Sequence, residues 1–434
     1  MAGAAVILAV VGAALPPRHT QMLDGNVYDT SRKRMLLLVA CRKNWQHPRV
    51  SITEGDDTKE GESRMKRIMA TALCCMLLAS AHAAWGEPFT PGRETCGREH
   101  CFWETAMEIS DEEAVWAMLT QPMTVLSGDP RGQTRVYAQP DASSESIGEV
   151  TCMSQGVHVL EQLDNGWSRI ECYSSSFKGS QVEAWNQLVV GYVRTELLTE
   201  RQVKTRYGLV VDKLTQRLYL FHDGRLLDTL AVSTGLADAD HPWNETRSGE
   251  YVLNSPSGAF PSENLMCNYG IRYNDGDLIH EVPHVVTASG KNYGYTEPRL
   301  GSRASHGCIR VQRRRTPQGI NMRWLWDRLK DQMGTRLVIW EDWTGRQIPI
   351  PDESLTLYYN PRGGENYHAA ETCYGVRDKY LPLTAFTYGE LEDESFSALT
   401  ACAYCNPAMR AGEIEAVNEK YAGPSGENTD GIKE

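Results

Sequence analysis

The residues best suited to covalent chemistry lie around Cys308, in the sequence ASHGCIRV. A cysteine thiol becomes a nucleophile when neighbouring groups favour its thiolate form. His306 and Arg310 each lie two residues from Cys308, and Gly307 lets backbone N–H groups approach a developing oxyanion. An Ile-His pair, Ile279-His280, lies 28 residues upstream. The pattern predicts a nucleophilic thiol, and a disulfide is the alternative role for Cys308 in an exported chain.

The sequence around Cys308 resembles the catalytic domain of the L,D-transpeptidases, the YkuD-type family. The resemblance rests on Ile279-His280, at the end of a predicted strand, and on the segment LGSRASHGCIR at 300–310. It extends upstream to Ser233-Thr234-Gly235 and downstream to the helix that carries Trp324, over about 135 residues.

The resemblance implies a role for each matching residue and no cofactor for catalysis. Cys308 would attack the carbonyl of the third residue of a peptidoglycan stem peptide, release the terminal D-residue and form a thioester. His280 would take the thiol proton and later activate an incoming amine. Backbone N–H groups of Gly307 and Cys308 would bind the oxyanion. Ser305, His306 and Arg310 supply the remaining substrate or oxyanion contacts, with holding the loop as the alternative role of His306 and Arg310.

Three features depart from the family pattern. Glu281 replaces the usual Gly or Ser after the base, but it keeps the backbone carbonyl that orients the imidazole. The usual Thr-Pro-x-Gly strand start reads Thr246-Arg247-Ser248-Gly249, a change expected to affect packing more than catalysis. The interval before Cys308 is longer than in the shortest members, so His284 is a competing base. The segment 283–296 is then either a flap over the site or a plain surface loop.

A second cluster of chemically capable residues lies near the C-terminus. It contains His368, Cys373 and the pair Cys402-x-x-Cys405, and this spacing matches the ligands of a tetrahedral structural zinc. The segment also resembles small Cys/His modules of the Ada metal-binding type. In an oxidising compartment a disulfide from Cys373 to Cys402 or Cys405 would serve equally. Both roles stay open at this point.

The elements that must position these residues are mostly short strands, which predict a mainly β, multidomain chain. A stretch with Gly-Trp and Gly-Tyr-Val positions resembles the bacterial Src-homology-3-like barrel over about 65 residues, and Cys152 and Cys172 are expected on neighbouring strands there, where a disulfide could join them. One helix is expected from Met322 to Met333, capped by Gly334. The expected units are a helical lead-in at 85–131, the small barrel at 132–200, the β-rich catalytic domain at 204–345, a small α/β Cys/His module at 355–411 and a polar tail at 412–434.

The N-terminal region predicts export. Met65-Lys66-Arg67, an apolar run at 68–79 and a small-residue end have the form of a signal peptide over 65–84. The run is too short for a retained membrane span. A signal peptide must begin the chain, so 1–64 is interpreted as an over-extended, disordered start.

Length and charge limit the remaining function classes. With 434 residues the chain should form several domains, and its net charge of −12 provides no overall field for nucleic acid. The sequence therefore predicts a secreted bacterial enzyme of the cell wall, with stem peptides as substrates and the barrel as wall contact. Two alternatives remain, namely a carboxypeptidase that uses water as acceptor and a catalytically silent wall-binding protein.

Overall fold

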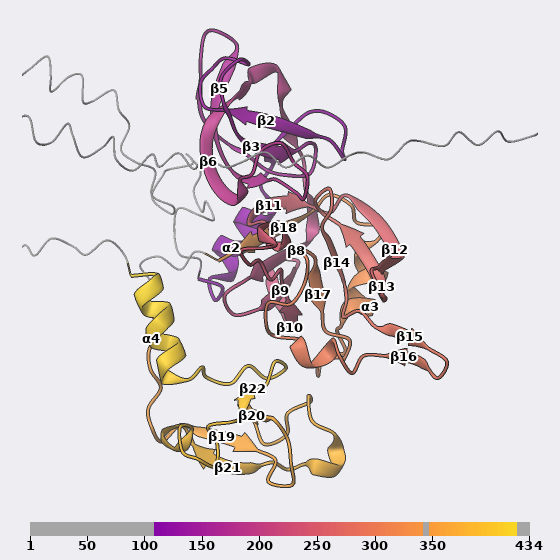
Figure 1. Cartoon of the computed structure of the whole chain (residues 1–434), viewed down its shortest axis with the longest axis vertical. Helices are drawn as coiled ribbons and strands as arrows, with labels where there is room; N and C mark the ends of the chain where they lie inside the picture. Colours follow the sequence, from indigo (N-terminus) through magenta and orange to yellow (C-terminus); the bar gives the residue numbers. More distant parts are fainter. Residues whose placement is uncertain (1–107, 342–346, 423–434) are drawn as a thin grey trace, which may run out of the picture. The chain divides into compact units, whose positions relative to one another are not determined.

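The protein is described here by a computed structural model that covers residues 108–341 and 347–422. The predicted signal peptide, the N-terminal extension and Cys96 and Cys101 lie outside the described residues. The described chain is mainly β-structure arranged in several sheets, as the sequence predicted (Figure 1).

The lead-in contributes one helix that packs on the sheet of the predicted catalytic domain. Helix α2 (Glu112–Thr120) begins after Asp111, whose side chain accepts a hydrogen bond from the N–H of Ala114 at 3.0 Å. Its buried residues pack in one cluster with Val210, Phe221, Val338 and Trp340. The helix is thus a cover for that sheet. The strand that follows, β1 (Met123–Leu126), pairs with β7 (Leu198–Arg201).

A five-stranded sheet occupies the position of the predicted barrel, and it is called the five-stranded unit below. Its sheet order is β3-β2-β6-β5-β4. The expected disulfide is wrong, because Cys152 and Cys172 are both free, buried thiols. Cys152 follows β3 whereas Cys172 lies in β5, and β2 and β6 separate these strands in the sheet. The strands are β2 (Gln133–Tyr137), β3 (Ser146–Thr151), β4 (His158–Gln162), β5 (Trp167–Ser175) and β6 (Trp185–Arg194).

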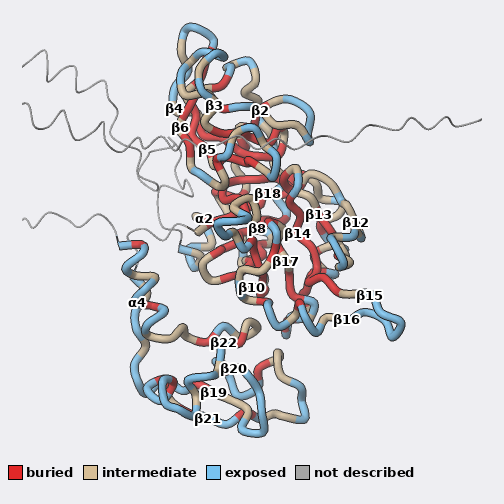
Figure 2. Tube along the Cα trace, in the orientation of Figure 1, coloured by how far each residue is buried: buried red, intermediate tan, exposed pale blue. Residues whose placement is uncertain are grey.

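A nine-stranded sheet forms the largest part of the described structure. Its order is β11-β18-β8-β9-β10-β17-β14-β13-β12, with parallel pairing of β18 to β8 and of β14 to β17. Figure 2 shows β8, β14, β17 and β18 as mostly buried. The strands are β8 (Lys204–Asp212), β9 (Arg217–His222), β10 (Arg225–Ser233), β11 (Gly249–Val252), β12 (Ser255–Ser262), β13 (Leu265–Arg272), β14 (Leu278–Glu281), β17 (Ile309–Val311) and β18 (Thr335–Trp340).

Both faces of the sheet are covered at β8 and β18, which explains the almost continuous apolar runs of these two strands. Alternate residues of β8 point to opposite faces. Leu209 and Val211 join the main core with helix α3 (Met322–Leu329), whereas Val210 joins the cluster under α2. Helix α3 begins after Asn321 but ends before the predicted Gly334, because residues 330–334 turn back and the Gly334 N–H donates to the Leu253 carbonyl.

The C-terminal module is built on a small sheet of order β21-β19-β20-β22. The segment predicted as a polar tail at 412–434 begins with helix α4 (Ala411–Lys420), whose Ile414 is buried. The Asn418 side chain both accepts from and donates to the Ile348 backbone, which holds that helix in place. The strands are β19 (Thr356–Tyr359), β20 (Asn366–His368), β21 (Thr384–Thr387) and β22 (Thr400–Ala401).

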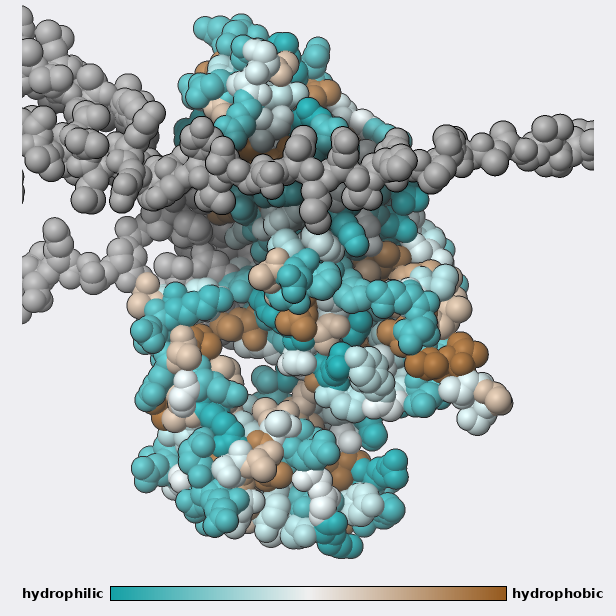
Figure 3. Space-filling model, in the orientation of Figure 1, coloured by the Kyte–Doolittle hydropathy of each residue, from teal (hydrophilic) through white to brown (hydrophobic). Residues whose placement is uncertain are grey.

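One hairpin projects from the nine-stranded sheet, formed by β15 (Val285–Thr287) and β16 (Gly290–Asn292) (Figure 1). Figure 3 shows hydrophobic residues over this hairpin on an otherwise largely hydrophilic face. Val286 in this hairpin is 65% exposed. Among the described residues, no helix is long and apolar enough to span a membrane.

Candidate active site

The pairing of two short strands brings the candidate nucleophile and base together. In the parallel pair of β14 and β17, Ile279 lies opposite Ile309 and His280 lies opposite Arg310. Cys308 immediately precedes β17 and therefore lies level with Leu278. Because residues in register and residues two apart share a face of a sheet, the side chains of Cys308, Arg310 and His280 project to the same side.

The imidazole of His280 is held in one tautomer. Its Nδ1 lies 2.7 Å from the backbone carbonyl of Glu281, which can only accept, so Nδ1 carries the proton and Nε2 is left as a proton acceptor. Burial, together with the nearby charge of Arg310, lowers the pKa of His280 to about 4, although the hydrogen bond to the Glu281 carbonyl acts in the opposite direction. The ring is therefore neutral at pH 7. The predicted orienting role of the carbonyl after the base has the expected geometry.

Cys308 is a free thiol, which removes the disulfide alternative for this residue in the structure. Burial and, to a smaller extent, the negative charge of Asp277 raise its pKa to about 12. The N–H of Leu278 donates to the sulfur and, with Arg310, opposes this rise. The resting site is thus a neutral thiol beside a neutral imidazole, not a preformed ion pair.

The turn before Cys308 is closed by Ser305. The Ser305 hydroxyl donates to the Cys308 carbonyl at 2.5 Å and accepts the Gly307 N–H at 3.2 Å. This N–H, predicted to bind an oxyanion, is therefore already used within the turn. His306 is exposed, and its Nδ1 lies 3.9 Å from a carboxylate oxygen of Glu263.

Arg310 is half-buried, and burial lowers its pKa. Among the residues that the structure describes, no hydrogen bond or ion pair occupies its guanidinium. A guanidinium placed in this way can bind a carboxylate through two parallel hydrogen bonds.

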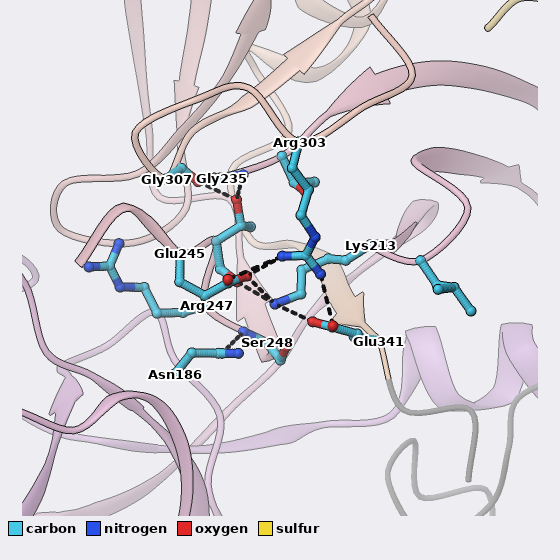
Figure 4. Close-up of polar contacts among 12 residues, drawn as sticks. Asn186, Lys213, Gly235, Glu245, Arg247, Ser248, Arg303, Gly307 and Glu341 are labelled. Atoms are coloured by element: carbon cyan, nitrogen blue, oxygen red, sulfur yellow. Dashed lines mark hydrogen bonds and ion pairs between the residues drawn. The ribbon is translucent and has the colours of Figure 1, made fainter. Parts of the chain in front are cut away.

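A network of four charged residues holds Arg303 (Figure 4). Arg303 begins the turn of residues 303–308, which leads to Cys308 and is called the catalytic turn below. The fully buried Lys213 ammonium lies 2.6 Å from Glu245 and 3.0 Å from Glu341. Arg303 contacts the same two carboxylates at 2.9 and 2.8 Å. Sequence reasoning missed these residues, because a charge that is buried by tertiary packing has no local sequence pattern.

Thr246 holds the other side of the turn. Its hydroxyl donates to the Gly307 carbonyl at 2.7 Å and accepts the Gly235 N–H at the same distance. Figure 4 shows these bonds between the labelled glycines. Thr246 and Gly235 belong to two segments that the family resemblance singled out, so the pattern marked the right positions without the contact between them.

The competing base, His284, lies at the foot of the projecting hairpin. Its ring packs 5.1 Å from that of Tyr293, and its backbone pairs with Met266. The Tyr293 hydroxyl donates to the Glu281 carboxylate at 3.0 Å. These contacts tie His284 to the hairpin, whereas His280 lies in the strand beside the catalytic turn.

The four predicted metal ligands meet in the C-terminal module. The donor atoms of His368, Cys373, Cys402 and Cys405 all lie within 4.8 Å of one another, and the first three residues are buried. The Cys373 and Cys402 sulfurs are 3.8 Å apart, and the Cys405 sulfur is 3.6 Å from His368 Nδ1. All three cysteines are free thiols, so neither expected disulfide is formed.

This module contacts the predicted catalytic domain through its Cys402-x-x-Cys405 turn. The Tyr404 hydroxyl donates to Glu297 at 3.0 Å, and Arg217 donates to the Asn406 side chain at 2.6 Å. Glu297 lies in the segment that leads to the catalytic turn, so the turn that carries two candidate metal ligands also contacts that segment.

Comparison with known families decides the identity of the central region. Residues 206–339 match the model of the YkuD family, the L,D-transpeptidase catalytic domain. This region is a YkuD-type catalytic domain. The match contains every residue of the site described above from Lys213 to Arg310, and Glu341 lies two residues beyond it.

Solved structures similar to this chain include several L,D-transpeptidases. That of Xylanimonas cellulosilytica (residues 123–326) is 21% identical over 32% of this chain and 64% of that one, with a TM-score of 0.23. That of Stackebrandtia nassauensis is 19% identical over 32% and 58%, with a TM-score of 0.21. An L,D-transpeptidase from Mycobacterium smegmatis is 14% identical over 51% of this chain and 92% of that chain, with a TM-score of 0.25. This chain thus covers less than two thirds of the first two. A search of curated proteins found no match.

The match of residues 206–339 to the YkuD model confirms the resemblance that the sequence around Cys308 indicated. The resemblances of the five-stranded unit to Src-homology-3 domains and of the C-terminal module to Ada-type modules remain predictions. The roles of the individual site residues are likewise taken up below as proposals.

Proposed function

We propose that this protein is a secreted L,D-transpeptidase that cross-links peptidoglycan stem peptides through a thioester on Cys308. The observation that carries the proposal is the shared sheet face of Cys308, His280 and Arg310 on β14 and β17, inside a YkuD domain. The tautomer of His280 supports it, because Nε2 is the nitrogen left to accept a proton. In this proposal the protein works in the bacterial cell wall, and the five-stranded unit contacts the wall polymer.

The reaction runs through two acyl transfers. The thiol proton moves to His280 as the sulfur attacks the carbonyl carbon of the third stem residue, and the oxyanion forms next to the N-terminal end of β17. Collapse of this intermediate breaks the peptide bond. His280 returns the proton to the leaving amine of the terminal D-residue, and the thioester remains. An acceptor amine then attacks the thioester, loses a proton to His280 and regenerates the thiol.

The electrostatics of the site suit a proton transfer that is concerted with attack. Because the pKa of His280 is lowered to about 4, the ring is available as a base at neutral pH. Because the pKa of Cys308 is raised to about 12, the thiolate forms only as the substrate is attacked. Arg310 binds the carboxylate of the stem peptide in this proposal, and Ser305 holds the turn.

The main alternative, an L,D-carboxypeptidase, differs from the transpeptidase only in the acceptor that attacks the thioester. Water in place of the amine turns the same thioester into a trimmed peptide, the product of an L,D-carboxypeptidase. A silent wall-binding protein would form neither product, and the arrangement of Cys308 and His280 favours an active enzyme.

Incubation of the exported protein with muropeptides, followed by mass spectrometry, tests the proposal. Cross-linked dimers that disappear with Cys308→Ala and with His280→Ala are the expected result. Trimmed monomers alone would favour the carboxypeptidase. Turnover that persists in Cys308→Ala would overturn the mechanism, and an intact protein that forms no thioester adduct would favour the silent protein.

For the C-terminal module we propose a structural zinc held by His368, Cys373, Cys402 and Cys405. A tetrahedral site with Zn–S bonds of about 2.3 Å places two sulfurs about 3.8 Å apart, which is the separation of Cys373 and Cys402. Backbone N–H groups of Ala369 and Gly375 donate to the Cys405 and Cys373 sulfurs at 3.3 and 3.2 Å, and such bonds stabilise thiolate ligands. A disulfide would require the sulfurs to approach to about 2.05 Å.

A further inference from the structure

Arg247 is an arginine without free donors in the interior of the protein. Its side chain is 2% exposed, and its Nη1 lies 3.2 and 2.9 Å from the two carboxylate oxygens of Asp277. Nη2 donates to the carbonyls of Ser176 and Trp243 at 2.8 and 3.0 Å, and Nε also donates to Ser176. A buried guanidinium is stable only when it is satisfied in this way.

The partners of Arg247 come from two different units. Asp277 and Trp243 belong to the YkuD domain, whereas Ser176 directly follows the last strand residue of β5 in the five-stranded unit. The guanidinium carbon also lies 4.0 Å from the ring centroid of Phe177. Arg247 therefore joins the five-stranded unit to the catalytic domain.

The ion pair of Arg247 and Asp277 packs against Gly307 of the catalytic turn. A Cβ atom built on Gly307 would be 2.6 Å from an Asp277 oxygen and 3.1 Å from Arg247 Nη1. Asp277 also directly precedes Leu278, whose N–H donates to the Cys308 sulfur. The pair thus contacts the catalytic turn at Gly307, and Asp277 directly precedes β14, the strand that carries His280.

The two residues before Arg247 hold the same turn. Glu245 binds Arg303 at the start of the turn, and Thr246 binds the carbonyl of Gly307 near its end. Three consecutive residues, 245–247, therefore each fix a different point around Cys308. In the family pattern quoted above, the third of these positions is usually proline, which has no charge and no donor to offer.

We propose that Arg247 and Asp277 are positioning residues for the Cys308 turn, and that the Ser176 carbonyl of the five-stranded unit completes their arrangement. The inference rests on the proposed function, because positioning matters only if Cys308 reacts. Neither residue is assigned a proton transfer or a contact with substrate. The catalytic domain of this chain is then incomplete without the unit that precedes it.

The charges of Arg247 and Asp277 should affect how readily the Cys308 thiol ionises. A loss of structural support alone would not shift this ionisation in opposite directions in the two variants. Asp277→Asn removes a negative charge beside the thiol and leaves Arg247, so it favours the thiolate. Arg247→Gln does the opposite, because it leaves Asp277 without its counter-charge. The other groups whose charges act on or respond to Cys308 are unchanged in both variants, namely Cys267, Arg272, Tyr273 and Arg310. The proposed base, His280, is also unchanged.

The experiment measures alkylation of Cys308 by iodoacetamide at pH 9, resolved by peptide mass spectrometry, in the full protein. We expect alkylation about tenfold faster in Asp277→Asn and about tenfold slower in Arg247→Gln, corresponding to opposite pKa shifts of about one unit. Muropeptide turnover should fall at least tenfold in both. Arg247→Lys keeps the charge but not the five-donor geometry, so it should leave the alkylation rate near that of the unaltered protein while turnover falls.

Glu250→Gln is the matched control. Glu250 is also a buried carboxylate, paired with Arg336 and with His158 at 2.6 Å, and it has no contact with the turn among those described. It should change neither the alkylation rate nor turnover by more than twofold, in samples whose circular dichroism shows folded protein. Alkylation rates that stay constant, or move in the same direction in both charge variants, overturn the inference. If the alkylation rates change in opposite directions but the unaltered protein has no muropeptide turnover, the positioning role is supported and the proposed function is refuted.

Discussion

Asp277 and Gly307 approach each other so closely that the glycine cannot be replaced without a rearrangement. The carboxylate oxygen of Asp277 occupies the space 2.6 Å from where a Cβ would lie, and Gly307 has φ +121°. Both facts come from residues 30 positions apart in the chain, brought together by the register of β14 and β17.

Gly307→Ala should therefore be one of the most damaging small substitutions in the protein. We expect a loss of about 2–4 kcal/mol in the free energy of unfolding and at least a hundredfold fall in turnover, because the side chain meets a buried ion pair. Urea unfolding and muropeptide assays measure the two effects. Gly319→Ala is the control, since Gly319 has φ +82° but no atom within 4 Å of the place where an added Cβ would lie, and it should cost only about 1 kcal/mol.

The reactivity of Cys308 should depend on pH as expected of a thiol whose pKa is raised. Its pKa is raised to about 12, so the thiolate fraction and the alkylation rate should increase about tenfold per pH unit from 8 to 11 without a plateau. Alkylation followed by mass spectrometry measures this profile. A plateau near neutral pH would show a preformed thiolate and would contradict the neutral resting site.

Because of the network around Lys213, the free energy of unfolding should decrease at acidic pH. Burial alone would raise the pKa of Glu341, but the charges of Lys213 and Arg303 lower it overall, below its ordinary value of 4.5. The stabilisation is then fully present above pH 4.5 and is lost as the pH falls toward the folded-state pKa. Glu341→Gln should be about 1–3 kcal/mol less stable at pH 7, with a flatter decline below pH 4.5. Urea titrations at several pH values test this, and parallel curves for the two proteins would refute it.

The two candidate bases, His280 in β14 and His284 at the foot of the hairpin, should differ sharply in function. His280→Ala should reduce turnover by about 10²–10⁴-fold, the usual loss when a general base is removed. His284→Ala should keep turnover within about threefold, because that ring packs on Tyr293. Muropeptide turnover of the two variants measures the difference. Equal losses, in variants of equal stability, would show that His280 is not the sole base.

Metal analysis tests the C-terminal site. We expect one zinc per chain in protein purified without chelators, and its removal by a chelator should lower the melting temperature, because binding energy of such sites is folding energy. Cys405→Ser should lose the metal. Cys267→Ser alters another buried thiol outside the cluster and should retain it. A metal-free protein whose mass shows the loss of two hydrogens would instead establish a disulfide.

Local sequence indicated the chemistry that we propose for this protein. The residues around Cys308, with His280 upstream, indicated the catalytic domain because they carry the motif of the YkuD-type family, in which a thiol and a glycine lie in one short stretch of chain. The spacing of His368, Cys373, Cys402 and Cys405 likewise predicted one cluster, because two short turns can each present a pair of ligands. The mainly β composition of the chain also followed from its short apolar segments.

Only the tertiary structure decided how these groups are held. Cys152 and Cys172 were expected on neighbouring strands, but β2 and β6 lie between their strands in the sheet, because sheet order is set by packing across the whole unit. Arg247, the Thr246 hydroxyl and Lys213 gave no signal of the tertiary contacts that hold the catalytic turn and its neighbours. Each makes its interactions with residues distant in the chain, and burial alone makes those interactions strong. A charge on the surface and a charge in the interior look the same in a sequence.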